Sequence, residues 1–152
     1  MSTKMISEIS SSSSDETEQL GEALGSRLKG GEIIELISDL GGGKTTLTRG
    51  ISRGIGSNNH VSSPTFKICN VYEGKKLRIY HYDFYRLSEP GLIEHELQDA
   101  FADSEAVIVV EWPDIIENIL LKERLTINIR NSGEQSRKIV YNYPASLSYL
   151  VE

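Results

Sequence analysis

The part of the chain best suited to chemistry is a run of glycines followed by a lysine and two threonines. Consecutive glycines let a backbone wrap closely around phosphate oxygens, and their N–H groups form a nest for anions. An ammonium at Lys44 can neutralise the β- and γ-phosphates of a nucleotide, and a hydroxyl at Thr45 can bind Mg²⁺. The segment therefore predicts a site for a nucleoside triphosphate with magnesium. Its predicted binding residues are Asp39, Leu40, Gly41, Gly42, Gly43, Lys44, Thr45 and Thr46.

The flanking segments have the composition that such a loop requires. Glu32–Ile37 is almost continuously apolar, as expected of a strand buried on both faces. After Lys44, apolar residues recur every fourth position up to Ile55, which predicts a helix ending near Gly54. Ser38 departs from the usual G-x-x-x-x-G-K-[ST] pattern, so the turn either avoids positive φ there or carries mild strain. The alternative is a purely structural turn with a surface lysine.

A phosphate loop needs at least one further carboxylate to hold Mg²⁺. Glu111 directly follows the apolar run 107–110, which places it at the tip of a central strand. Asp83 ends the strand-like segment 77–82, and a strand-end or turn-capping carboxylate is the alternative interpretation of both residues. His81 lies two residues before Asp83 and is either a metal partner or a neutral structural histidine. Thr65 follows Ser63–Pro64 and can sense the γ-phosphate or belong to a plain turn.

Composition limits the class of protein. The 152 residues fit one domain, and no stretch approaches the roughly 18 apolar residues of a membrane-spanning helix. A net charge of −6 argues against generic nucleic-acid binding, although residues 44–86 hold eight Lys or Arg against two Asp or Glu. The single cysteine, Cys69, excludes an intrachain disulfide and suits the cytoplasm. We expect a flexible Ser-rich arm over 1–13 and one P-loop ATPase domain over 14–152.

Periodicity predicts a mixed α/β protein with three layers. Asp15 and Glu18 suggest a capping box for a first helix that ends at Gly30–Gly31. Further predicted elements are a strand at 106–110, a hairpin of 66–72 with 77–82, a helix at 90–100, a short helix around 115–120, and a C-terminal antiparallel hairpin at a sheet edge. The expected fold is a P-loop NTPase-like mixed sheet with parallel core strands.

Four stretches together resemble one family. They are SDLGGGKTT at 38–46, SPTF at 63–66, HYDFYRL at 81–87 and VEWP at 110–113. The chain resembles the TsaE (formerly YjeE) family over about residues 15–143. That family supplies the ATPase of the bacterial tRNA threonylcarbamoyladenosine system, and the segment 92–101 matches it poorly.

The resemblance implies roles for particular residues and partners. Lys44 would bind phosphates, while Thr45 and Glu111 would hold Mg²⁺ with Asp83 nearby as a metal-water or catalytic carboxylate. Thr17 would lie near the nucleotide base. The resemblance further implies slow ATP hydrolysis by the protein alone, and action with TsaB and TsaD in modifying adenosine-37 of tRNA, with no role for a membrane.

Three other functions stay open from the residues alone. A small-molecule kinase of the P-loop class fits the size, but it needs an arginine-bearing lid, and Arg137–Lys138 is the only basic pair after Glu111. A GTPase would use Thr65 as a switch residue, yet the chain has no Asn-Lys-x-Asp motif. A scaffold with a structural nucleotide is the third alternative.

Overall fold

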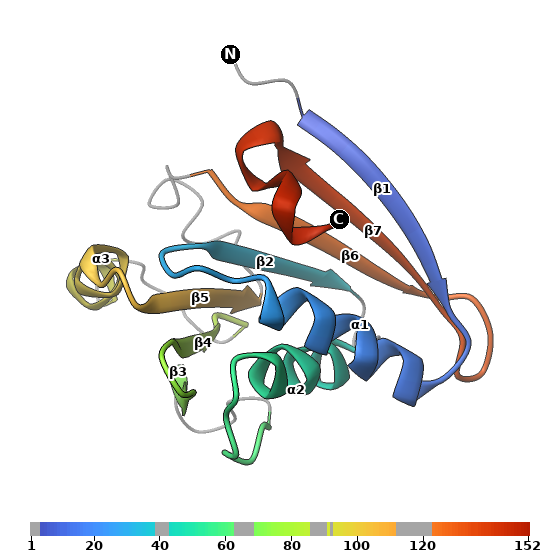
Figure 1. The fold of residues 1–152 in the computed structure, drawn as a ribbon, viewed down its shortest axis with the longest axis horizontal. Coiled ribbons are helices and arrows are strands. Elements are labelled where there is room, and N and C mark those ends of the chain that lie inside the picture. The colour runs from blue at the N-terminus through green and yellow to red at the C-terminus, as the bar shows by residue number, and fades with distance from the viewer. Residues whose placement is uncertain (1–3, 39–42, 63–68, 86–90, 92, 112–122) are drawn as a thin grey trace.

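The computed structural model describes residues 4–38, 43–62, 69–85, 91, 93–111 and 123–152, and these residues form one mixed sheet with flanking helices (Figure 1). The sheet has seven strands in the order β1-β7-β6-β2-β5-β4-β3. The elements are β1 (Lys4–Ser11), α1 (Ser14–Ser26), β2 (Ile33–Ser38), α2 (Lys44–Gly54), β3 (Cys69–Glu73), β4 (Arg78–Asp83), α3 (Glu94–Ala102), β5 (Ala106–Glu111), β6 (Leu125–Asn131), β7 (Arg137–Pro144) and the 3₁₀ helix η3 (Ala145–Leu150). The predicted α/β fold is confirmed.

The centre of the sheet is parallel and the edges are antiparallel. Strand β2 pairs in parallel with both β5 and β6, and β4 pairs in parallel with β5. Strands β3, β7 and β1 run antiparallel to their neighbours. The carboxyl ends of β2, β4 and β5 therefore meet at one edge, where ligands bind in open α/β sheets.

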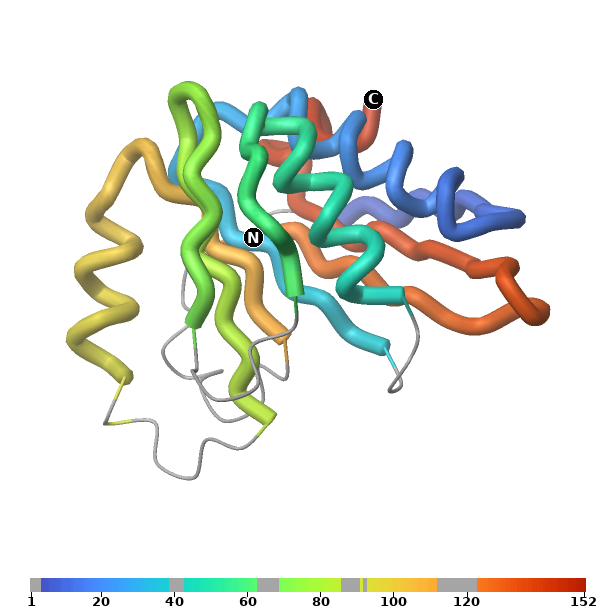
Figure 2. Tube along the Cα trace, turned by 90° about the horizontal axis from the view of Figure 1, so that it is seen from below, coloured from blue at the N-terminus to red at the C-terminus, as the bar shows by residue number. Residues whose placement is uncertain are grey.

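Helices cover both faces of the sheet, as Figure 2 shows from below. Alternate strand residues point to opposite faces, so Ile34 and Leu36 pack in the cluster beneath α1 and α2. Ile33 points the other way, into a second cluster with Leu97 of α3. Because buried aliphatic side chains each contribute about 1.5–3 kcal/mol, these two clusters account for the three-layer arrangement.

Helices α1 and α2 run parallel and touch through glycines. A Cβ added to Gly21 would lie 2.4 Å from the carbonyl oxygen of Leu47, and one added to Gly25 would lie 2.3 Å from that of Ile51. The facing residues advance by four along both helices, which shows that the helices share a direction. The amino-terminal ends of α1 and α2 therefore lie at the same side of the molecule.

This backbone contact predicts a large effect of adding one methyl group. We expect Gly50→Ala to lower the free energy of unfolding by about 2–3 kcal/mol, even after the roughly 1 kcal/mol that alanine gains as a helix former. The new Cβ would lie 2.1 Å from the carbonyl oxygen of Glu18, which is backbone and cannot move aside alone. Urea unfolding measures the change.

The matched control is Gly91→Ala, because a Cβ there meets nothing within 4 Å. Its unfolding free energy should stay within about 0.5 kcal/mol of wild type. Equal stability of the two variants would show that α1 and α2 do not depend on glycine at their contact.

The prediction of a flexible arm over residues 1–13 is wrong for Lys4–Ser11. These residues form β1, which pairs along its whole length with β7, from Lys4 opposite Pro144 to Ser11 opposite Arg137. Most β1 side chains are exposed, so the strand is held by backbone hydrogen bonds that the side-chain pattern does not reveal. The C-terminal hairpin β6–β7 is confirmed, but it does not form the sheet edge, because β1 covers β7.

The N-cap of the first helix lies two residues before the predicted cap, Asp15. Ser13 is the N-cap and its Oγ accepts a hydrogen bond from the backbone N–H of Glu16 at 3.1 Å. The carboxylate of Glu16 accepts in return from the backbone N–H of Ser12 at 2.6 Å. The short helix expected around 115–120 lies outside the described residues. None of the helices in the described ranges is long and apolar enough to cross a bilayer.

Candidate functional site

The candidate site begins where β2 leads into α2. Ser38 is the last residue of β2, so its backbone is extended and avoids the positive φ that serine disfavours. Gly43 is the N-cap of α2 with φ 101°, a left-handed conformation that favours glycine. Lys44 starts the helix, as predicted. The partial positive charge of the helix amino terminus is therefore directed at this end of the sheet.

Lys44 contacts the carboxylate that ends the neighbouring strand. The Lys44 ammonium lies 3.4 Å from Oε1 of Glu111, and both side chains are almost completely buried, at 9% and 3% exposure. Glu111 is the last residue of β5 and pairs in register with Leu36 of β2. The structure thus brings together two of the predicted residues, which are 67 positions apart in the sequence.

A fully buried histidine holds the other oxygen of the same carboxylate. Nε2 of His81 lies 2.5 Å from Oε2 of Glu111, and a carboxylate can only accept, so Nε2 donates. Nδ1 of His81 lies 3.0 Å from the hydroxyl of Tyr72, which itself donates to the backbone oxygen of Ser62 at 3.0 Å. Both ring nitrogens have protein partners, which disfavours the metal-ligand interpretation of His81. Its geometry is that of a residue that positions Glu111.

These neighbours set the charge state of Glu111. Burial on its own would raise the pKa of this carboxyl, because a low dielectric disfavours the ionised form. The hydrogen bond and charge from His81, together with the charge of Lys44, outweigh burial, so the pKa of Glu111 lies below its usual value. Glu111 is therefore an anion held between two donors at neutral pH.

The lowered pKa predicts how stability depends on pH. An ionised Glu111 stabilises the fold above its unfolded pKa of about 4.3, and this contribution is lost as the pH falls through the lower folded pKa. We expect the stability gap between wild type and Glu111→Gln to be larger near pH 7 than near pH 3.5, measured by urea unfolding. For the exposed Glu105→Gln the gap should not change. A Glu111→Gln gap that widens in acid would contradict the assignment.

Asp83 lies next to Glu111 at the same sheet edge. It ends β4 and is the register partner of Glu111, and the backbone N–H of Phe84 donates to the carbonyl oxygen of Glu111 at 3.1 Å. Oδ1 of Asp83 also accepts from the backbone N–H of Tyr85 at 3.0 Å. Asp83 therefore caps a turn, as its alternative interpretation states, and still stands beside the predicted metal ligand.

The donor set at this edge suits Mg²⁺. Magnesium prefers oxygen ligands and keeps several waters, so one or two protein oxygens with nucleotide phosphates suffice. The Thr45 hydroxyl lies in the first turn of α2 and the Glu111 carboxylate ends the strand next to β2. In the described part of the chain, no three His, Cys, Asp or Glu side chains gather as a metal cage. The residues fit an ion held jointly by protein, phosphate and water.

Thr17 lies in the first turn of α1, on the side of the molecule where α2 begins. It is buried, and its hydroxyl is 2.7 Å from that of Ser11 and 3.2 Å from the backbone oxygen of Ser13. The next residue along α1, Glu18, contacts Gly50 of α2 through its backbone, because a Cβ added to Gly50 would lie 2.1 Å from the carbonyl oxygen of Glu18. This position agrees with a place near the site, while the role of Thr17 beside a nucleotide base stays a prediction.

Several predicted residues lie outside the described ranges, and one contact was not predicted. Asp39, Leu40, Gly41, Gly42 and Thr65 fall in segments that the structure does not describe. Arg137 is part of the predicted hairpin, as the first residue of β7, and it also lies beside Gly43. A Cβ added to Gly43 would lie 3.5 Å from Nε of Arg137. A basic residue at the start of β7 carries no local signal for this contact, since only the sheet order brings it there.

The fold and the site together define a class of protein. A mixed sheet with a parallel centre, in which one central strand leads through a glycine-containing segment into a helix that starts at lysine, is typical of the P-loop fold. The solved structure of Bacillus subtilis YdiB is similar, with a TM-score of 0.77 and 29% sequence identity over 99% of this chain and 95% of that one. This agreement confirms the P-loop class for the chain.

The sequence comparisons identify the family within that class. Residues 11–139 match the family described as threonylcarbamoyl adenosine biosynthesis protein TsaE. The TsaE protein of Bacillus subtilis is 36% identical over 127 residues, which are 84% of this chain and 79% of that protein. The TsaE protein of Streptomyces coelicolor is 42% identical over 114 residues, 73% and 76% of the two chains. The chain belongs to the TsaE family, which takes part in tRNA threonylcarbamoyladenosine biosynthesis.

Proposed function

We propose that this protein binds ATP with Mg²⁺ at the end of β2 and hydrolyses it slowly on its own. The observation that carries the proposal is the contact of 3.4 Å between the Lys44 ammonium and the Glu111 carboxylate at the start of α2. A buried ammonium needs an anionic partner, because an unpaired buried charge is costly. Triphosphate oxygens are a stronger partner for Lys44 than one carboxylate, so the nucleotide takes Lys44 over from Glu111.

Transfer of Lys44 to the phosphates would leave Oε1 of Glu111 open. His81 keeps Oε2 at 2.5 Å, which fixes the orientation of the carboxylate while Oε1 is released. Thr45, Glu111 and, directly or through water, Asp83 would then hold Mg²⁺. When bound, this ion neutralises charge that develops on the phosphates during hydrolysis. Arg137 beside Gly43 adds a second positive charge at the loop.

The proposed ATPase activity would serve tRNA modification. We propose that it supports formation of N6-threonylcarbamoyladenosine at position 37 of tRNA, together with TsaB and TsaD, in the cytoplasm. Family membership supports this role, since the matching family is defined by threonylcarbamoyladenosine biosynthesis. Hydrolysis would rise when the partners are present, as expected of an enzyme that resets a complex between turnovers.

Reconstitution of tRNA modification tests the proposal. Purified TsaB and TsaD, tRNA and the threonylcarbamoyl donor are combined with ATP and Mg²⁺, with and without this protein. We expect modification beyond one turnover of the complex when the protein is present, and a stop near one turnover without it. Nucleoside analysis of the digested tRNA measures the product.

The nucleotide and the metal serve as controls in the same reaction. GTP should replace ATP poorly, and EDTA should stop multiple turnovers. Modification that continues equally well without this protein, or that prefers GTP, would rule out the proposed function.

A further inference from the structure

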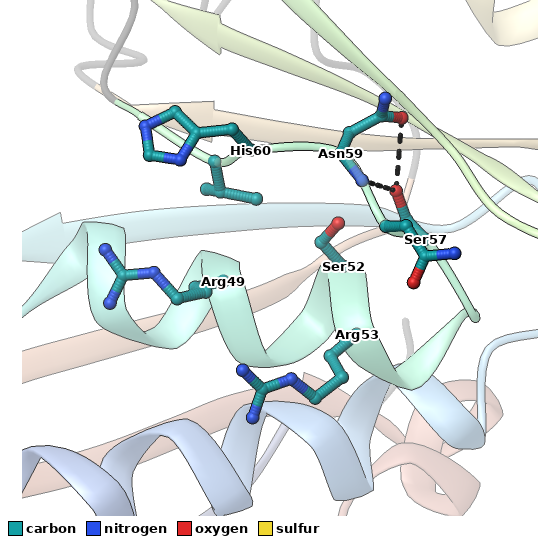
Figure 3. A pocket seen from close by; sticks show the side chains of 8 residues that line it. Arg49, Ser52, Arg53, Ser57, Asn59 and His60 are labelled. Carbon is teal, nitrogen blue, oxygen red and sulfur yellow. Dashed lines mark hydrogen bonds between the residues drawn. The ribbon is translucent and has the colours of Figure 1, made fainter.

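A pocket lies between α2 and the segment 57–61 that follows it, and neither Lys44 nor Glu111 is among its described lining residues. Figure 3 shows Arg49 and Arg53 along one rim, Asn59 and His60 along the other, and Ser52 between them. The pocket has a volume of about 280 Å³ and is also lined by Ser57, Asn58 and Val61. The described residues of its lining are mostly polar or basic, and none of them is a carboxylate.

The floor of this pocket holds a buried hydroxyl for which the described part of the chain supplies no hydrogen-bond partner. Ser52 is 1% exposed, and its Oγ has no hydrogen-bond partner among the described residues. In Figure 3 the hydroxyl points from α2 toward the segment that carries Ser57 and Asn59. A buried polar group is normally hydrogen-bonded, because leaving it unpaired costs free energy. A ligand that accepts from Ser52 would remove that cost.

The rim supplies more positive than negative charge. Arg49 and Arg53 are one helical turn apart, and their side chains are about half exposed, at 45% and 54%. Among the described residues, one carboxylate contacts both of them: Glu18 of α1 lies 3.9 Å from Arg49 Nε and 3.3 Å from Arg53 Nη1. Two guanidinium groups against one carboxylate leave a net positive charge and several N–H donors.

The far rim is organised by its own hydrogen bonds. The side-chain oxygen of Asn59 accepts from the Ser57 hydroxyl at 3.2 Å and from the backbone N–H of Glu73 at 2.7 Å. The backbone N–H of Asn59 donates to Oγ of Ser57 at 3.1 Å. These bonds fix the Asn59 amide, so the wall opposite the arginines keeps its shape without a ligand.

We propose that this pocket binds one phosphate group, at a site separate from the nucleotide. A tetrahedral phosphate can direct one oxygen to the Ser52 hydroxyl and others to the two guanidinium groups, which match phosphate geometry. A planar carboxylate has two oxygens. If each oxygen accepts from one arginine, no further oxygen is left for the Ser52 hydroxyl. The phosphate comes either from solution or from the backbone of an RNA strand.

Phosphate-dependent thermal unfolding tests the site. The intact protein is unfolded at increasing concentrations of inorganic phosphate and at constant ionic strength. Saturating ADP and Mg²⁺ are present to occupy the proposed nucleotide site at Lys44, so that the measured stabilisation reports on phosphate bound elsewhere. Ser52→Ala should leave the unfolding temperature without phosphate unchanged or slightly higher, since it removes an unpaired hydroxyl. Its phosphate affinity, derived from the stabilisation, should fall by about tenfold.

Charge variants separate a built site from general attraction. Arg53→Gln should weaken phosphate binding by about tenfold, and Glu18→Gln should strengthen it, because Glu18 competes for the guanidinium groups. Arg130→Gln changes an exposed arginine elsewhere and should leave the affinity unaltered.

A second titration, with short fluorescein-labelled RNA, distinguishes free phosphate from the phosphodiester of an RNA backbone. Weaker RNA binding by Ser52→Ala and Arg53→Gln assigns the site to a phosphodiester, whereas an effect on inorganic phosphate alone assigns it to a free phosphate.

Two outcomes would overturn the proposal. One is that phosphate raises the unfolding temperature of Ser52→Ala and Arg53→Gln as much as that of the wild-type protein. The other is an equal loss of phosphate affinity in Arg53→Gln and Arg130→Gln, which would show that phosphate is attracted by net charge alone. Nucleotide binding is measured on the same variants by calorimetry, so failure of the phosphate site is distinguishable from failure of the proposed ATP site.

Discussion

Lys44→Ala is expected to abolish ATP binding at concentrations where the wild-type protein is saturated. Lys44 is the buried cation at the start of α2, and its side chain is 9% exposed. Truncating one partner of a desolvated charge pair costs about 2–5 kcal/mol, which corresponds to a loss of roughly thirtyfold to several thousandfold in affinity. Isothermal titration calorimetry with ATP and Mg²⁺ measures the dissociation constant.

The control for this variant is Lys76→Ala, which removes an exposed lysine in the turn between β3 and β4. It should bind ATP like the wild-type protein. Circular dichroism of Lys44→Ala establishes that the fold persists, because the variant also removes one partner of Glu111. A folded Lys44→Ala protein with unchanged affinity for ATP would show that the phosphates bind elsewhere.

Glu111→Gln is expected to separate binding from hydrolysis. ATP affinity should stay within about tenfold of wild type, because the glycine loop and Lys44 still hold the phosphates. The hydrolysis rate should fall by about a hundredfold or more, since stabilisation of charge by a correctly held metal acts mainly in the transition state. Glutamine keeps the volume of the side chain, so the change removes charge rather than packing.

Initial rates of phosphate release at saturating ATP measure this effect, with the partner proteins present to raise the basal rate. The exposed Glu105→Gln serves again as the control and should hydrolyse ATP normally. Unchanged hydrolysis by Glu111→Gln would remove this residue from the metal site and leave Asp83, its neighbour in register on β4, as the candidate.

His81 gives the two predictions a shared structural basis. It approaches the Glu111 carboxylate on the oxygen opposite Lys44, and Tyr72 holds its other nitrogen. Because His81 holds Oε2 of Glu111, the carboxylate can exchange its partner at Oε1 without changing its orientation. Such support of a ligand by a second residue is common around metal sites, and for the proposed ligand Glu111 it would come from the strand next to β5.

Local patterns in the sequence determined most of the individual elements. Continuous apolar runs predicted β2 and β5, because strands covered on both faces have no polar side, and period-four apolar residues predicted α2. The glycine run before Lys44 predicted the phosphate loop, since few other residues allow such close backbone approach. Four short stretches in their correct order identified the TsaE family, which the comparisons confirm.

Only the tertiary structure decided which distant residues meet. Strand β1 has largely exposed side chains and is defined by backbone pairing with β7, so no side-chain period could predict it. Strand order brings His81 to Glu111 and Arg137 to Gly43. Helix packing buries the Ser52 hydroxyl, which finds no hydrogen-bond partner among the described residues. The physical reason is that periodicity reports which face of an element is buried, whereas a site depends on which neighbours cover that face.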